Sequence, residues 1–216
     1  MSTYTLRHFP IQARPETCRA LLSYDGGDYT SEHPVWPMEK SKQPFGKVPV
    51  LIETDASGNV FQLSDSMAIE HYLATKKGLM VDSSPQDRAR QDELRSQILD
   101  IFLFAPQYRF ATEEARKTIK EQYVTQAKFF IDFHESHLKN NGSNGYYFGS
   151  KITYVDIALV ATMRALRRFG DESMPGMTGY LSPERTPLIN KVLDVVGNDP
   201  KLAKFFSEPR VKPAVL

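Results

Sequence analysis

The spacing of hydrophobic and polar residues divides the chain into two parts. Residues 4–9 alternate with the two-residue period of a β-strand. Further short elements are predicted before residue 78: strands over residues 29–33, 48–52 and 60–63, and helices over residues 15–24 and 66–77. Prolines 34, 37 and 44 exclude regular structure between residues 34 and 46. The first part is therefore predicted to be mixed α and β.

No strand pattern remains after residues 79–86, whose Asp-Ser-Ser-Pro sequence predicts a linker. Helices are predicted beyond it from apolar residues three and four positions apart: residues 94–105, 119–134, 157–166, 186–197 and 200–207. Thr153 and Asp156 form a predicted capping box before the third of these, which is apolar on nearly all sides and is expected to be buried. The predicted fold class is α/β plus all-α: a mixed domain over residues 1–78, a linker over 79–86 and a helical domain over 87–216.

The composition excludes several classes of protein. The 216 residues carry 27 basic and 26 acidic side chains, a formal net charge of +1, and so offer no basic surface for nucleic acid or an anionic membrane. The longest apolar runs have only five residues, against about 20 for a membrane span. The single cysteine, Cys18, allows no intramolecular disulfide and no thiolate metal cluster. We therefore expect a cytoplasmic protein with no membrane or nucleic-acid partner.

Five local motifs occur in order along the whole chain. They are Tyr-Thr-Leu-Arg-His-Phe-Pro-Ile at 4–11, Trp36-Pro37 followed by Lys40, Lys-Val-Pro-Val-Leu at 47–51, Asp-Ser-Met-Ala-Ile at 65–69 with Tyr-Leu-Ala at 72–74, and Ile-Thr-Tyr-Val-Asp at 152–156. Together they resemble the cytosolic glutathione transferases, closest to the sigma class and its alpha, mu and pi relatives. The resemblance implies a thioredoxin-like domain that binds glutathione, followed by a helical bundle with a pocket for a hydrophobic electrophile. It also implies a homodimer that uses glutathione as co-substrate in detoxification, without a metal.

The resemblance implies that glutathione lies along the end of the predicted sheet. Val48, joined to Pro49 by a cis peptide bond, pairs with the cysteinyl unit of glutathione in this arrangement. Ser66 and Asp65, at a helix N-terminus, hold the γ-glutamyl carboxylate and ammonium. The residues alone leave two ordinary alternatives, which are a trans proline that begins a strand and plain capping of the helix by its first residues.

Further positions follow from the same resemblance. Trp36 and Lys40 match residues that grip the glycyl carboxylate, and Lys47 either adds a second cation there or points to water. Asp100 matches an acid that reaches the glutamyl ammonium in the neighbouring subunit. The electrophile pocket maps to Phe9, Phe104 and Tyr108. Packing or a solvated surface position is the alternative for these residues.

The catalytic position departs from the family. The related classes carry a tyrosine where this chain has His8, and Tyr4 lies about 13 Å away along an extended strand. A free thiol has a pKa of about 8.5, and lowering it by two units takes about 2.7 kcal/mol. One hydrogen bond to a charged acceptor supplies about 1.5–3 kcal/mol. His8 is expected to supply it as an N–H donor or as an imidazolium, with Arg14 adding a positive field. The alternative is a structural histidine in a protein that binds glutathione but turns over poorly.

Other candidate chemistry is weaker. Cys18 lies inside the first predicted helix, where a buried packing thiol is expected. His134 and His137 have the spacing of a metal pair but no evident third ligand.

The activity that the resemblance implies is glutathione conjugation. The alternatives are a glutathione-dependent isomerase of the prostaglandin-synthase kind, a non-catalytic ligand-binding protein and an interaction module like those on translation factors. The last should lack the ammonium and carboxylate clamps, which this chain retains.

Overall fold

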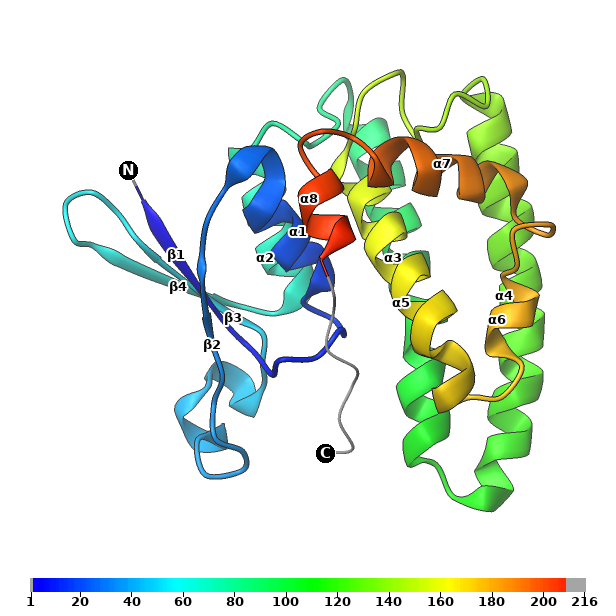
Figure 1. Cartoon of the computed structure of the whole chain (residues 1–216), viewed down its shortest axis with the longest axis horizontal. Helices are drawn as coiled ribbons and strands as arrows, with labels where there is room; N and C mark the ends of the chain where they lie inside the picture. The colour runs from blue at the N-terminus through cyan, green and yellow to red at the C-terminus, as the bar shows by residue number, and fades with distance from the viewer. Residues whose placement is uncertain (1, 209–216) are drawn as a thin grey trace. The chain divides into compact units, whose positions relative to one another are not determined.

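The computed structural model of the chain describes residues 2–208. They form two compact units: one contains the residues up to Met80 together with the segment from Asp199 onward, and the other contains Val81–Asn198. The first unit holds the sheet and the second is helical, as the sequence predicts (Figure 1).

The first unit is built on a four-stranded sheet. Its strands are β1 (Thr3–Arg7), β2 (Thr30–Glu32), β3 (Val50–Thr54) and β4 (Val60–Ser64). They lie in the order β2-β1-β3-β4, with β1 and β2 parallel and the other neighbouring pairs antiparallel. Asp55 closes the turn between β3 and β4 (Figure 1), because its carboxylate accepts hydrogen bonds from the backbone N–H groups of Ser57 and Asn59.

The register of the sheet aligns four strand ends in one row. Arg7 pairs with Glu32 on one side and with Val50 on the other, and Val50 pairs with Ser64. The segments next to this row are those that follow β1, β2 and β4 and the one that precedes β3. Because neighbouring strands lie about 4.8 Å apart, these four segments leave the sheet side by side at one edge.

Helices α1 (Glu16–Ser23) and α2 (Ser66–Lys76) pack together in this unit. The core that they share with the sheet is apolar: Leu6, Leu21, Val50, Leu51, Ile69 and Leu73 are each at most 2% exposed. Glu53 of β3 ties α2 to the sheet, since its carboxylate accepts hydrogen bonds from Tyr72 and Lys76. Cys18 is buried in α1, as expected for a packing thiol.

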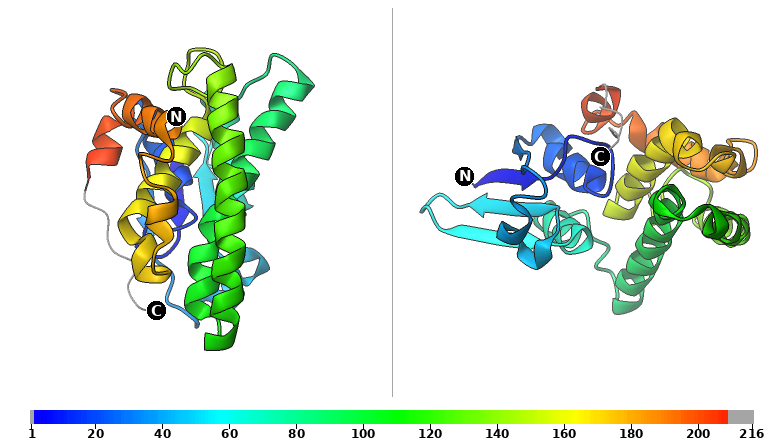
Figure 2. Two further views of the ribbon diagram at one scale, coloured as in Figure 1. Left: turned by 90° about the vertical axis from the view of Figure 1, so that its right-hand side faces the viewer. Right: turned by 90° about the horizontal axis from the view of Figure 1, so that it is seen from below.

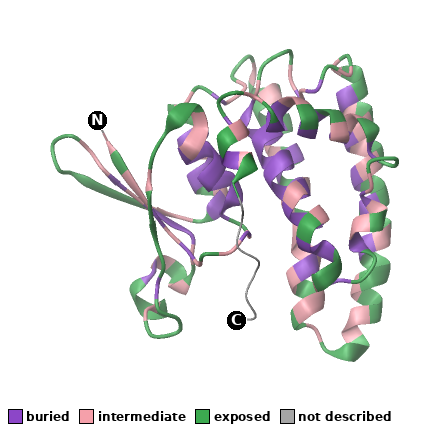
Figure 3. Cartoon of the chain, in the orientation of Figure 1, coloured by how far each residue is buried: buried purple, intermediate pink, exposed green. Residues whose placement is uncertain are grey.

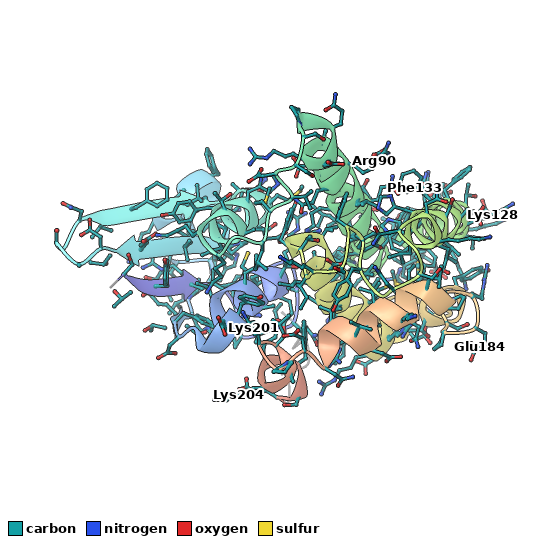
Figure 4. The ribbon with its side chains drawn as sticks, turned by 90° about the horizontal axis from the view of Figure 1, so that it is seen from above. Arg90, Lys128, Phe133, Glu184, Lys201 and Lys204 are labelled. Carbon is teal, nitrogen blue, oxygen red and sulfur yellow. The ribbon has the colours of Figure 1, made fainter. Side chains whose placement is uncertain are left out.

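The short helix α8 (Ala203–Ser207) belongs to the first unit, whereas the sequence analysis assigned the whole C-terminal segment to the helical domain. It contacts α1, and Leu202 and Phe205 bury their side chains there. Lys201 (Figure 4) adds an ion pair to Asp25 at 3.3 Å and accepts a hydrogen bond from the Asp25 N–H at 3.2 Å. A single sequence reveals the helix but not which of two cores buries it.

The second unit is all-helical. Its helices are α3 (Pro85–Phe110), α4 (Glu113–Asn140), α5 (Tyr154–Ser173), α6 (Met177–Tyr180) and α7 (Pro187–Gly197). α3 and α4 run side by side (Figure 2), and α5 is the buried centre of the unit (Figure 3), with Ile157, Leu159 and Val160 fully inaccessible. None of the helices in residues 2–208 combines the length and apolarity required to cross a bilayer.

Asp156 organises the start of α5. Its carboxylate accepts hydrogen bonds from the backbone N–H and the hydroxyl of Thr153, at 2.7 and 2.6 Å, and completes the predicted capping box. The other carboxylate oxygen accepts from the Tyr147 N–H at 2.8 Å. Asp156 is fully buried, and burial raises its pKa to about 6 although these hydrogen bonds oppose the shift.

The candidate metal pair His134 and His137 is part of the same buried network. Nδ1 of His134 is hydrogen-bonded to the Tyr147 hydroxyl, and Nε2 of His137 lies 2.9 Å from the Tyr147 carbonyl oxygen. Burial lowers the pKa of His134 to about 3, so that this ring is neutral at pH 7. Both histidines therefore serve the packing of Tyr147, and no cluster of three potential metal ligands occurs in residues 2–208.

Replacing Asp156 should destabilise the protein. In Asp156→Ala, the N–H groups of Tyr147 and Thr153 lose their acceptor, and each buried unpaired group costs about 1–3 kcal/mol. We expect the free energy of unfolding, measured with urea, to fall by roughly 2–5 kcal/mol. The exposed Asp132 of α4 provides the control, since Asp132→Ala should change it by less than about 0.5 kcal/mol. Equal stability of the two variants would contradict this role.

The pH dependence gives a second readout of the same carboxyl group. Its folded pKa of about 6 exceeds the ordinary value of 3.8, so the protonated form stabilises the fold below pH 3.8. That contribution is lost as the pH rises through 6. Asp156→Asn lacks the titrating group, so its stability relative to the parent should increase by up to about 3 kcal/mol between pH 4 and pH 7.

Candidate functional site

His8 directly follows β1, and both of its backbone groups are fixed. Its N–H donates to the Glu32 carbonyl at 2.9 Å, and its carbonyl accepts from Nδ1 of His33 at 2.7 Å. The side chain is only 6% exposed, and its Nδ1 lies 3.0 Å from the carbonyl oxygen of Phe9. Because a carbonyl oxygen can only accept, this contact places the proton of a neutral ring on Nδ1.

The imidazole of His8 is neutral at pH 7. Its pKa is lowered to about 4, mainly by burial and in smaller part by Arg19 and His33, against the hydrogen bond to Phe9, which raises it. The imidazolium form considered from the sequence is therefore not the state of this ring in the free protein. Any activation of a thiol by His8 must begin from the neutral ring.

A buried arginine that the sequence analysis did not single out holds the loop after His8. Arg19 of α1 donates hydrogen bonds to the carbonyl groups of Ile11, at 2.7 Å, and Phe9, at 2.9 Å. It also forms an ion pair with Glu16 at 3.0 Å. Arg14, the arginine expected near the thiol, is exposed. The signal for Arg19 was its place three residues after Glu16, on a helix that is otherwise largely apolar.

Aromatic contacts connect this loop to the segment after β2. The rings of Phe9 and Trp36 meet edge to face with centroids 5.4 Å apart, and Nζ of Lys40 lies 5.9 Å from the centre of the Trp36 ring. Trp36 is 37% exposed, so its indole is supported by Phe9 yet remains open to solvent. An N–H donor and an ammonium are thus grouped beside the end of β1, although the structure also shows a packing role for Trp36.

The segment before β3 offers an unpaired stretch of backbone. The bond between Val48 and Pro49 is cis, which confirms the expectation drawn from the resemblance. Within residues 2–208, the peptide groups of Val48 make no backbone hydrogen bond, and Val48 lies two residues before the start of β3. This backbone can therefore accept another extended chain. Lys47, next to it, is exposed.

Asp65 caps α2, so the ordinary alternative for this residue is realised in the structure. Its Oδ1 accepts hydrogen bonds from the N–H groups of Met67 and Ala68, at 3.0 and 3.2 Å. The residue is exposed and has a positive φ of 77°, an uncommon backbone conformation that is enriched at ligand sites. Oδ2 of Asp65 has no hydrogen-bond partner among residues 2–208. Ser66 is buried beside it, 2% exposed.

The helical unit contains the remaining expected positions. Asp100 and Phe104 of α3 line a groove of about 540 Å³ against Phe129, Phe130 and Phe133 of α4. Arg90 lies over Phe133 (Figure 4), with its guanidinium carbon 5.7 Å from the ring centre. Tyr108 is not among the residues that line this groove and packs instead under Arg116, at 5.4 Å. Asp100 itself is exposed.

Comparisons with known proteins assign the chain to a family. Residues 94–209 match the family model of the glutathione S-transferase C-terminal domain. A protein of Caenorhabditis elegans named "Probable glutathione S-transferase 6" is 30% identical over 167 residues, which span 74% of this chain and 78% of that protein. The chain belongs to the glutathione S-transferase family. The N-terminal unit with its cis-proline and the helical unit are the two parts of that fold.

Other relatives of this glutathione S-transferase differ in what their names state. The "Hematopoietic prostaglandin D synthase" of Gallus gallus is 28% identical, over 72% of this chain and 75% of its own length. A solved structure from the hookworm Necator americanus, described as monomeric Na-GST-3, superposes with a TM-score of 0.76 at 24% identity and covers 97% of this chain and 99% of its own. That second likeness supports the fold alone.

The first unit of this glutathione S-transferase brings together most of the positions expected to bind glutathione. His8, Val48 and Asp65 adjoin the aligned row of strand ends, and Trp36 is joined to them through Phe9. Two expected contributors, Arg14 and Lys47, are exposed. Arg19, which orders the loop, was missed.

Proposed function

We propose that this glutathione S-transferase binds glutathione along the row of strand ends and joins its thiol to hydrophobic electrophiles. The observation that carries the proposal is the order of chemical groups along that row. Beyond β4 lie the carboxylate of Asp65 and the N-terminus of α2. Just before β3 lies the backbone of Val48, which makes no backbone hydrogen bond within residues 2–208, and after β2 lie Trp36 and Lys40.

The dimensions of the row fit the ligand. Four strands span three spacings of about 4.8 Å, or roughly 14 Å. An extended tripeptide reaches about 10 Å through its backbone alone, and the end groups of glutathione extend it further. The ammonium and carboxylate of its glutamyl end suit Asp65 and the helix N-terminus, where Ser66 lies. Its glycyl carboxylate suits the Trp36 indole and the Lys40 ammonium, with Lys47 as a second cation. The cysteinyl thiol then lies near His8.

The chemical role proposed for the site is activation of that thiol. His8 contacts the sulfur, Arg19 orders the loop that carries His8, and Phe9 contributes apolar surface for the electrophile. Detoxification in the cytoplasm is the corresponding biological setting. Arg14, being exposed, adds at most a screened positive charge.

A glutathione-dependent isomerase is the second candidate, because one relative is named as a prostaglandin D synthase. The two reactions differ in the fate of glutathione, which a transferase consumes and an isomerase regenerates. A protein that binds glutathione without turnover is the third possibility, since a neutral, buried His8 is a weaker activating group than a tyrosine hydroxyl.

Calorimetry with glutathione, combined with a conjugation assay on a generic aryl halide, tests the proposal. We expect micromolar to millimolar binding and stoichiometric loss of glutathione as the conjugate forms. Product formation without loss of glutathione would favour the isomerase. Binding without turnover of either kind would leave only a binding protein, and absence of binding would refute the site altogether.

The Asp65 carboxylate should account for a large part of the binding energy. Asp65→Asn keeps an oxygen that can cap α2 but removes the charge, so glutathione binding should weaken by about 1.5–3 kcal/mol with little loss of stability. Asp65→Ala removes both and should also destabilise the protein by about 0.5–2 kcal/mol. Calorimetry and urea unfolding separate the two effects. Unchanged affinity in Asp65→Asn would rule out the ammonium contact.

We further propose that the protein is a homodimer in which Asp100 of each subunit reaches the glutamyl ammonium in its partner's site. Asp100 lies at an open groove beside the 63% exposed Phe129, which is the kind of surface that a second copy would cover. Sedimentation should show a dimer at micromolar concentration. The Asp100→Asn variant should bind glutathione more weakly but remain a dimer. A monomer would disprove the assembly, whereas a dimer with normal affinity in Asp100→Asn would disprove only the shared contact.

A further inference from the structure

The free nitrogen of the His8 ring carries a lone pair and no proton. Nδ1 must bear the hydrogen of the neutral ring, because its partner at 3.0 Å, the Phe9 carbonyl oxygen, cannot donate. Nε2, on the other side of the ring, has no hydrogen-bond partner within residues 2–208. It is also not one of the fully buried side-chain atoms that lack a partner. In this tautomer, Nε2 can accept a hydrogen bond or a proton but cannot donate.

The environment keeps the ring in this tautomer. Arg19 donates to the same Phe9 oxygen at 2.9 Å, and its own position is fixed by Ile11 and Glu16, so that the acceptor for Nδ1 cannot easily rotate away. The charged or titratable groups nearest the ring are Arg19 and His33, and both disfavour a positive charge on the free ring. Arg7 and Glu32 of the neighbouring strands neutralise each other in an ion pair at 2.9 Å.

We propose that His8 activates glutathione as a proton acceptor at Nε2, instead of donating a hydrogen bond to the thiolate as a tyrosine hydroxyl does at this position. This inference rests on the proposed function, since it requires the glutathione sulfur to lie at His8. In the step itself the S–H bond breaks, the proton forms an N–H bond at Nε2, and the electron pair stays on sulfur. The resulting thiolate lies next to an imidazolium. The Nδ1–H of this ring donates to the Phe9 carbonyl oxygen, and its Nε2–H donates to the sulfur.

The remaining steps balance without a further reagent. The sulfur electron pair forms the bond to the electrophile, and the leaving group departs with the electrons of the bond that breaks. The imidazolium then returns its proton to solvent, which restores the neutral ring. The attraction between thiolate and imidazolium must offset the low basicity of the buried ring, so the charged pair is expected only while the thiol is bound.

Heteronuclear NMR of the imidazole nitrogens tests this directly. The free protein should show hydrogen on Nδ1 alone. With glutathione at neutral pH, both nitrogens of His8 should carry hydrogen while ultraviolet absorbance shows a bound thiolate. With S-methylglutathione, which has no ionisable thiol, the ring should stay neutral. A ring that remains neutral in the glutathione complex, with its proton on either nitrogen, would overturn the acceptor role. Absence of glutathione binding by calorimetry would overturn the proposed function, and this role with it.

His8→Gln provides an independent test, because its amide can donate from a similar position but cannot take a proton. We expect glutathione to bind within about threefold of the parent affinity, while the thiolate fraction at pH 7 falls to a few per cent and conjugation falls roughly 10–100-fold. His71→Gln, on α2, is the control and should conjugate like the parent. If His8→Gln kept the thiolate and the activity, donation alone would suffice and the acceptor role would be wrong.

Discussion

The buried guanidinium of Arg19 is the constraint on which the geometry of the candidate site depends. A charge inside a protein is tolerated only when its hydrogen-bonding capacity is met, and here two loop carbonyls and Glu16 meet it. The loop after β1 is thereby tied to α1 at Phe9 and Ile11. Phe9 supplies both the acceptor for the His8 ring and an aromatic contact to Trp36, so one ion-paired residue orders two parts of the proposed glutathione site together.

Most of the fold could be predicted from the sequence because its signals are local. The capping box of Thr153 and Asp156, the apolar run of α5 and the turn chemistry between β3 and β4 depend on neighbouring residues only, and all appear in the structure. The long helices extend beyond their predicted limits because the first turns of α3 and α4 are polar and lack an apolar spacing. The packing of α8 on the first unit depends on contacts distant in sequence, and for that reason the sequence placed this helix in the helical domain instead.

The sequence selected residues that the fold brings to one row of strand ends, but it did not predict their electrostatics. The family resemblance selected Val48, Asp65 and Trp36, and each of them follows or precedes a strand end that pairing brings into one row. Sequence could not distinguish Arg14 from Arg19, since burial decides which arginine orders the loop and which is left at the surface. Nor could it assign the His8 tautomer, which depends on a single carbonyl orientation. For the same reason it left the imidazolium as an option for the free protein, which the burial of the ring excludes at neutral pH.

The burial of neutral His8 has a consequence for the pH range in which the proposed site exists. His8 and His134 both have folded pKa values well below the ordinary 6.5, because burial penalises their charged forms. Each contributes fully to stability above pH 6.5 and loses that contribution as the pH falls toward its folded pKa. The buried Asp156 acts in the opposite direction, because it contributes more stability as the pH falls from 6 to 4. This gain offsets the loss from only one of the two histidines. Acid therefore acts on the fold and on His8 together, since the proton that would abolish the proposed acceptor role of His8 also favours unfolding. The structure is thus suited to a site that works at neutral pH, where its free nitrogen is still unprotonated.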